Sequence, residues 1–216
     1  PIIYSQGQTT VAVIERDQIP ATLNGSLPHK ASNALAATAA AIMLGIEIAA
    51  IKEGLLGFES SSETTPGRMN IYTHLDYKIV VDFAAAPESM AALSIWSMSQ
   101  PVTGKRIGVI SAPGNRPDHF FAEMAAAAAG YYDYYICAPF SRDLRGRGPL
   151  EVQTHLSKQL QAHGISVENI EIAETIPSAI DMALKATDAN GLLVVATKDH
   201  EVVRGLIEIE KTNAQE

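Results

Sequence analysis

The feature that most constrains the fold is an alternation of largely apolar strand segments with helical segments after residue 67. The strand segments are 79–83, 106–111, 134–138, 167–172 and 192–197, and the helical segments are 88–99, 118–129, 150–163, 176–186 and 200–210. A strand that is apolar along its whole length is buried on both faces, which is typical of a parallel sheet covered by helices. We therefore expect an α/β, Rossmann-like fold with a parallel-rich sheet and right-handed crossovers.

Residues 1–58 have a different pattern and predict an incomplete α+β piece. Short β-type runs alternate with turns, and then two helices each end at a glycine: Ala31–Leu44 before Gly45, and Ile48–Leu56 before Gly57. Glycine at such a position commonly supplies a left-handed C-terminal cap. The polar segment 59–66 is predicted to be a linker. The expected organisation is therefore residues 1–58, a linker, and a second domain over 67–216.

Charge and composition exclude several classes of function. The net charge of −8 argues against an electrostatic nucleic-acid surface. The apolar stretch at 31–45 is shorter than the roughly 20 residues that a membrane span needs, and no signal peptide is visible, so a cytoplasmic location is expected. Cys137 is the single cysteine and is interpreted as a buried core thiol. The six histidines show no metal-binding spacing, so no metal ligand is predicted. Because residue 1 is Pro, we expect a piece of a longer polypeptide.

In open parallel sheets, ligands bind at the carboxyl ends of the strands. This rule selects the loops 82–88, 111–118, 139–149 and 197–200. The first of them is unusual, because Asp82 ends an apolar strand beside a predicted helix but is followed by alanines at 84–86. Asp82 is the candidate catalytic acid of this loop.

The loop 111–118 (SAPGNRPD) is a candidate anion site. Gly114 permits a tight turn, the next helix presents its N-terminus, and Arg116 has the geometry to bind a phosphate or carboxylate. The alternative is a plain strand–helix turn in which Asp118 is the N-cap. The sequence contains neither a GxxxxGK[ST] phosphate loop nor a GxGxxG motif.

The loop 141–148 (SRDLRGRG) gathers three arginines on an acidic protein: Arg142, Arg145 and Arg147. A cluster of this kind at a strand end suggests binding of a carboxylate or phosphate. Two alternatives without a ligand stay open. The loop is simply exposed to solvent, or its arginines only pair with local acids such as Asp118 and Asp143.

Two further positions combine polar side chains with a domain junction or a helix start. Arg68, in the PGR segment at 66–68, either covers a ligand or pairs with a carboxylate across the junction. His29, Lys30 and Asn33 stand at a helix start, where they bind a ligand or merely cap and pack.

These segments, taken in order, resemble the Mur ligase family, and within it the cyanophycin synthetases. The segment 29–58 (HKASNALAATAAAIMLGIEIAAIKEGLLGF) is similar to the HNxxNxLAA helix and the helix after it, which end the central domain of Mur ligases. PGRMNIY resembles the GR that opens their C-terminal domain, and VVDFAAAP stands at their DYAHNP motif. APGNRPD and DLRGRG resemble the APGDRRD and DxRGR of cyanophycin synthetases, which build an Asp–Arg polymer.

The resemblance implies the end of the Mur ligase central domain over 1–58 and the C-terminal domain over 67–216. It implies an ATP- and Mg²⁺-dependent parent enzyme, whose phosphate loop lies in a part absent from this sequence, so no tightly bound cofactor is expected. The resemblance implies nucleotide binding for Asn33 and Arg68, and a place near the incoming amine for Asp82 and the acid of the second loop. We therefore expect catalysis by Asp82 and, from the loop sequences, substrate or anion binding by Arg116, Asp118, Arg145 and Arg147. The implied partners are upstream ligase domains, an amino acid or Asp–Arg polymer, and a second copy of the chain.

Several positions depart from the family pattern and leave the activity open. The replacements are Phe83 for Tyr, Ala85 for His, Ala86 for Asn, Lys30 for the first Asn of HNxxN, and Asn115 for Asp. Each of the last four removes a group that the chemistry uses. Our first hypothesis is the C-terminal part of a cyanophycin-synthetase-like amide ligase with a degenerate Mur-type site, inactive in isolation. The alternatives are a non-catalytic scaffold that oligomerises or docks the polymer and, with less support, a free-standing nucleotide-binding domain.

Overall fold

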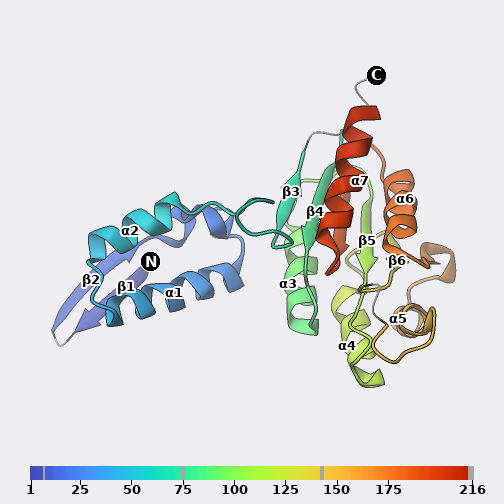
Figure 1. Ribbon diagram of the computed structural model, residues 1–216, viewed down its shortest axis with the longest axis horizontal. Coiled ribbons are helices and arrows are strands. Elements are labelled where there is room, and N and C mark those ends of the chain that lie inside the picture. The colour runs from blue at the N-terminus through green and yellow to red at the C-terminus, as the bar shows by residue number, and fades with distance from the viewer. Residues whose placement is uncertain (7, 74–75, 142–143, 214–216) are drawn as a thin grey trace. The chain divides into compact units, whose positions relative to one another are not determined.

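The computed structural model describes residues 1–6, 8–73, 76–141 and 144–213 (Figure 1). The chain divides into two compact units, an N-terminal unit of Pro1–Ser60 and a C-terminal unit of Ser61–Glu216. The boundary falls inside the polar segment 59–66. Within the described residues, no helix has both the length and the apolar character to cross a membrane.

The C-terminal unit is built on one six-stranded sheet (Figure 1). Its strands in spatial order are β3 (Asn70–Tyr72), β4 (Lys78–Asp82), β8 (Leu192–Ala196), β5 (Arg106–Ile110), β6 (Tyr134–Cys137) and β7 (Ile170–Ile172). The pairs from β4 to β7 are all parallel, and only β3 runs antiparallel to its neighbour. The predicted parallel-rich α/β fold is therefore confirmed.

Helices cover both faces of this sheet. The helices are α3 (Pro87–Met98), α4 (Asp118–Ala128), α5 (Glu151–Ala162), α6 (Ile176–Ala186) and α7 (His200–Asn213). Alternate residues of the central strands, such as Ile107 and Val195, form one core cluster with α6 and α7. On the other side α3, α4 and α5 pack against one another and against β8, β6 and β7. Every residue of β8 is buried, as its continuous apolar run predicts.

Three local predictions were wrong. The short strand β3 was missed, because three residues carry no readable periodicity. Residues 167–169 form a 3₁₀ helix (η3, Val167–Asn169), and strand β7 starts only at Ile170. Strand β7 lies at the sheet edge and pairs only with β6, so backbone hydrogen bonds from one side alone favour a longer strand. Gly57 belongs to helix α2 and is not left-handed, and the helix ends because Phe58 is extended.

The N-terminal unit consists of a hairpin and two helices. Its elements are β1 (Ile2–Gln6), β2 (Thr9–Ile14), η1 (Arg16–Gln18), η2 (Pro20–Thr22), α1 (Pro28–Met43) and α2 (Ile48–Gly57). The hairpin is antiparallel, and its inner side packs with Ile19 and Ile51 in a small core. Helix α1 begins earlier than predicted, since Pro28 is well suited to a first helical position. Gly45 is left-handed, with φ of 77°, as expected for a helix end.

Candidate functional site

The carboxyl ends of five parallel strands meet at one edge of the C-terminal sheet. The strands β4, β8, β5, β6 and β7 all run in the same direction, so the loops that follow them lie along this edge. Most of the residues selected from the sequence belong to these loops. The site is therefore described loop by loop along the edge.

Asp82 ends β4 and holds two strained backbone segments. Its Oδ2 accepts a hydrogen bond from the N–H of Met69 (2.9 Å), and its Oδ1 accepts one from the N–H of Ala84 (2.8 Å). Both partners have positive φ angles, 55° at Met69 and 27° at Ala84, which cost free energy in residues with a side chain. The carboxylate therefore stabilises the fold of this edge, and its catalytic role stays a prediction.

Arg68 lies against the end of β4. Its guanidinium carbon is 4.5 Å from the centre of the Phe83 ring, and Phe83 meets Phe140 edge to face at 5.3 Å. The turn before it requires glycine, because a Cβ on Gly67 would come within 2.6 Å of the His200 ring. The ring of Phe83, which stands where the family has Tyr, thus supports the Arg68 guanidinium, and the contact of Arg68 with a nucleotide stays a prediction.

Arg147 ties two loops and two helices together. Four of the five N–H groups of its guanidinium have partners: Nε donates to the Gly114 carbonyl (3.1 Å), Nη2 to the Arg116 carbonyl (2.7 Å), and Nη1 to Asp118 Oδ1 (2.8 Å) and Glu151 Oε1 (2.7 Å). We call this set the Arg147 clamp. At Arg147 the structure therefore shows the second alternative, in which the arginine pairs with local acids.

The charges of the clamp stabilise each other. The hydrogen bond to Glu151, followed by that to Asp118, raises the pKa of the Arg147 guanidinium. In turn, the hydrogen bond from Arg147 and then that from the Gly148 N–H lower the pKa of the Glu151 carboxyl. The clamp is therefore ionised at neutral pH, and it uses four of the five N–H groups of Arg147.

The other two described arginines of this region are exposed. Arg116 lies over the Phe120 ring, with its guanidinium carbon 5.2 Å from the ring centre. Arg145 has a positive φ of 51° in the loop before the clamp. Asp118 is the first residue of α4 and Pro117 is the N-cap, so the alternative in which Asp118 caps this helix was wrong. Arg142 and Asp143 lie outside the described residues.

A pocket of about 410 Å³ opens at the same edge, and sequence reasoning missed it. It is lined by Pro139, Ser141, Leu144, Glu174, Thr175, Ile176, Pro177, Asp199 and Val202. These described residues include two carboxylates, while Arg142 and Asp143, which stand between Ser141 and Leu144 in the sequence, lie outside the described residues. The signal in the sequence was an acid soon after each of two strands, Glu174 after β7 and Asp199 after β8. We call it the acidic pocket.

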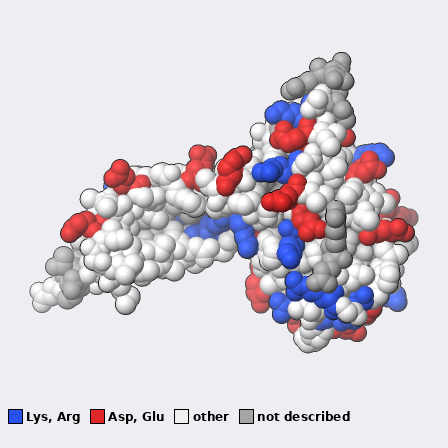
Figure 2. Space-filling model, viewed as in Figure 1, with Lys and Arg blue, Asp and Glu red and all other residues white. Residues whose placement is uncertain are grey.

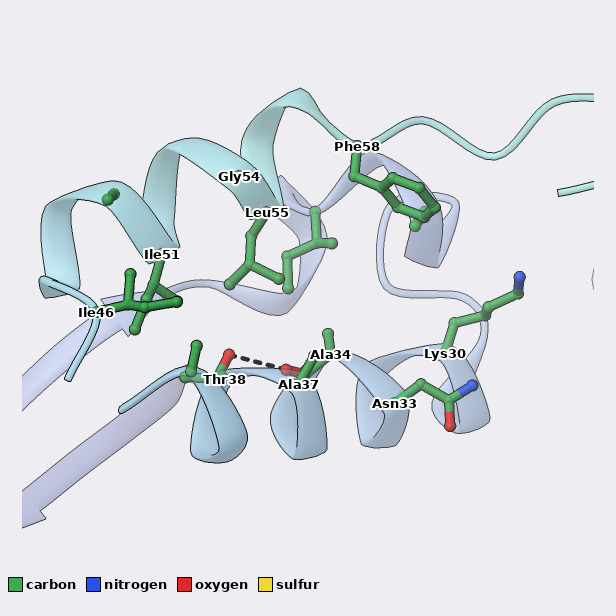
Figure 3. A pocket seen from close by; sticks show the side chains of 14 residues that line it. Lys30, Asn33, Ala34, Ala37, Thr38, Ile46, Ile51, Gly54, Leu55 and Phe58 are labelled. Carbon is green, nitrogen blue, oxygen red and sulfur yellow. Dashed lines mark hydrogen bonds between the residues drawn. The ribbon is translucent and has the colours of Figure 1, made fainter. Parts of the chain in front are cut away.

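The N-terminal unit holds a second, apolar cavity of about 500 Å³ between α1 and α2 (Figure 3). Ile51 and Leu55 of α2 point into it, while Lys30 and Asn33 stand near the start of α1 (Figure 3). Thr38 lines it too, but its hydroxyl donates to the Ala34 carbonyl (2.8 Å). Asn33 is exposed, and its predicted contact with a nucleotide stays a prediction.

The described ranges contain histidines, carboxylates and one cysteine. In them no group of three His, Cys, Asp or Glu side chains is arranged to hold a metal ion. Burial raises the pKa of the Cys137 thiol to about 12, as expected for an inert core cysteine.

Comparison with known proteins assigns a family. Residues 67–198 match the model of the Mur ligase, glutamate ligase domain. The chain is 32% identical over 207 residues to a cyanophycin synthetase of Geminocystis herdmanii, which covers 95% of this chain and 23% of that enzyme. It is 34% identical over 191 residues to the cyanophycin synthetase of Synechocystis sp., covering 88% of this chain and 21% of that enzyme. The chain thus spans about a quarter or less of these relatives.

Solved structures agree with the fold. A bifunctional folylpolyglutamate synthase/dihydrofolate synthase, solved with Mn, AMPPNP and L-glutamate, superposes with a TM-score of 0.65 at 17% identity. The superposition covers 94% of this chain and 44% of that one. Escherichia coli FolC in complex with ADP and DHPP has a TM-score of 0.60 at 23% identity, covering 84% of this chain and 39% of that one. The chain belongs to the Mur ligase family, with its glutamate ligase domain in the C-terminal unit.

Proposed function

We propose that this chain is the amine-binding end of an ATP-dependent amide ligase of the cyanophycin synthetase type. The observation that carries the proposal is the acidic pocket at the carboxyl edge of a Mur ligase C-terminal domain. The identity of 32–34% to cyanophycin synthetases over most of the chain supports it. In this proposal, residues 1–58 are the end of the Mur central domain and 67–216 the C-terminal domain.

In such a ligase, ATP phosphorylates a carboxylate, and an amine then attacks the acyl carbon, loses a proton and expels phosphate. This chain's share is to bind and orient. Arg68 and Arg116 are held at the carboxyl edge by their aromatic contacts. In this proposal both arginines stabilise the negative charge of a phosphate or carboxylate group during the reaction. Asp82 and the Arg147 clamp contribute indirectly, because their hydrogen bonds hold the backbone of the loops in place. We assign no metal ligand to the described residues.

The acidic pocket selects the amine substrate. Glu174 and Asp199 stand on loops after different strands, so a bound cation meets carboxylates from two directions. A guanidinium group fits this arrangement, since it donates up to five hydrogen bonds in a plane and pairs well with carboxylates. Leu144, Ile176 and Val202 provide apolar walls for an aliphatic stem. The substrate amine is therefore arginine, in keeping with an Asp–Arg product.

Titration of arginine into the full chain tests this proposal, with citrulline as the neutral analogue. We expect arginine to bind at least tenfold more tightly than citrulline, because removal of a charge-assisted hydrogen bond costs about 1.5–3 kcal/mol. Glu174→Gln and Asp199→Asn should each abolish most of this preference. Asp76→Asn is the matched control, since this exposed acid precedes β4 at the opposite edge of the sheet. Equal affinity for both ligands, or an effect of the control alone, contradicts the assignment.

A second candidate function is a scaffold without catalytic groups. Two observations favour it: Ala85 and Ala86 have no polar side-chain atoms, and both Asp82 and Arg147 are used in structural hydrogen bonds. A scaffold predicts no discrimination between arginine and citrulline, so the same titration separates the two functions.

A further inference from the structure

His200, a side chain to which the proposed function gives no role, lies between the acidic pocket and the turn that presents Arg68. It is the first residue of α7 and directly follows Asp199, which lines the pocket. Its ring packs against the backbone of Gly67, since an added Cβ there would come within 2.6 Å of the His200 Cδ2 and 2.9 Å of its Cγ. One side chain therefore joins the two parts of the site.

The turn that presents Arg68 has a fixed backbone. The N–H of Gly67 donates to Asn70 Oδ1 (2.7 Å), and its carbonyl accepts a hydrogen bond from the N–H of Phe83 (2.8 Å). Gly67 has a positive φ of 68°, a conformation that glycine adopts without strain. Because these bonds hold the turn as one piece, the His200 ring that packs on it helps to set where Arg68 lies at the sheet edge.

His200 itself extends from a backbone that is well anchored. Just before it, the N–H of Thr197 donates to the Asp82 carbonyl (2.9 Å), and Thr197 Oγ1 accepts a hydrogen bond from the N–H of Asp199 (3.1 Å). Just after it, helix α7 packs beside β4 (Figure 1) and buries Val203 in the core. The ring is therefore held in place from both sides, as a side chain that positions another group has to be.

We propose that His200 is a positioning residue, which fixes the separation between the acidic pocket and Arg68. The inference rests on the proposed function, in which the pocket binds the amine substrate and Arg68 stabilises phosphate or carboxylate. An amide ligase has to align these two reactants, because misplacement of one by about 1 Å can cost about a hundredfold in rate. His200 suits this role because it touches the Arg68 turn and follows Asp199 in the chain.

The alternative is that His200 only fills the space beside Gly67. The two roles differ in what a ligand in the acidic pocket does to the turn. A positioning ring is displaced together with Asp199 when the pocket is occupied, so the turn at Arg68 responds to the ligand. A ring that only fills space leaves the turn unchanged when a ligand binds.

Nuclear magnetic resonance of the full chain, with arginine as the probe, distinguishes the two roles. The α-protons of Gly67 lie beside an aromatic ring, so their chemical shifts report small displacements of that ring. We expect arginine to shift the signals of Asp199, Gly67 and Arg68 along one titration curve with one dissociation constant. Basic and acidic side chains are interspersed on the face of the C-terminal unit that Figure 2 shows, so every titration uses one ionic strength and one pH.

Three variants test whether the ring transmits the response. His200→Ala removes Cγ and Cδ2, the atoms nearest to Gly67, and should abolish the arginine-induced shifts at Gly67 and Arg68. Its affinity for arginine should stay within about twofold of the wild type, because His200 is not among the described residues that line the pocket. His200→Phe keeps both atoms and an aromatic ring, so it should retain the shifts. His163→Ala is the matched control, because His163 is exposed at the end of α5.

Two results overturn this inference alone. One is a His200→Ala variant that keeps the shifts at Gly67 and Arg68, and the other is a wild-type titration that moves Asp199 but neither of them. The second result needs no variant, so it decides the question even if His200→Ala does not fold. In both cases arginine still binds more tightly than citrulline, and the proposed function stands. Equal affinity for arginine and citrulline instead refutes the proposed function, and the role of His200 is refuted with it.

Discussion

Replacement of Arg147 by lysine should destabilise the C-terminal unit although the charge is kept. Lysine retains attraction to Asp118 and Glu151, but its ammonium cannot donate in the four directions that the guanidinium uses. The carbonyls of Gly114 and Arg116 then lose their donor. Gly114 has no room to adjust, because an added Cβ there would meet the Leu144 carbonyl oxygen. The clamp should therefore open where the two loops meet.

The magnitude follows from the two carbonyl bonds. A typical hydrogen bond contributes about 0.5–1.5 kcal/mol net, and the bond to Arg116 is at the exposed end of the clamp, so we expect a loss of about 1–2 kcal/mol in the free energy of unfolding. For a unit of this size, that lowers the melting temperature by roughly 2–8 °C. The ion pairs are left out of this estimate, since their solvent exposure screens them. Arg116→Lys is the control and should change stability by less than about 0.5 kcal/mol.

The assay is urea unfolding of both variants, repeated as a function of pH. The Glu151 carboxyl has a lowered pKa in the folded protein, so the stability that it contributes is present above the ordinary value of 4.5 and is lost as the pH falls below it. The advantage of the wild-type chain over a neutral Arg147→Met variant should therefore shrink in acid. If Arg147→Lys matches the wild type at neutral pH, the directional bonds of the clamp do not contribute as argued.

Three further predictions concern other parts of the chain. Asp82→Ala should cost more stability than Asp82→Asn, because the amide oxygen still accepts one of the two backbone N–H groups; equal thermal unfolding of the two variants would count against the proposed stabilisation of Met69 and Ala84 by Asp82. Cys137 should resist iodoacetamide at pH 8 in the native protein and react at once in denaturant, as mass spectrometry will reveal; rapid native labelling would contradict its burial. Limited proteolysis should first cut around residues 59–60, since Ser61 and Thr64 close a hydrogen-bonded turn directly after them, and early fragments ending inside 105–140 would contradict the sheet.

The amino-acid sequence by itself determined the class of fold. Continuous apolar runs such as 192–197 are readable because every position of a central parallel strand is buried, whichever neighbours the strand has. The edge strands were readable only in part, because β3 has three residues and β7 lost its first half to a 3₁₀ helix. The rule that ligands meet the carboxyl ends of strands also selected loops that the structure brings together at one edge of the sheet, and binding of a ligand there stays a prediction.

Only the tertiary structure decided what the side chains at that edge do. Arg147 and Arg145 look alike in the sequence, yet the close approach of Gly114 to the loop at 144 accompanies an Arg147 side chain that is turned inward and uses four of its five N–H donors. The acidic pocket was hidden because Glu174 and Asp199 follow strands that are not neighbours in the sheet. Strand order and loop packing depend on contacts between distant segments, and local residue patterns contain no information about them.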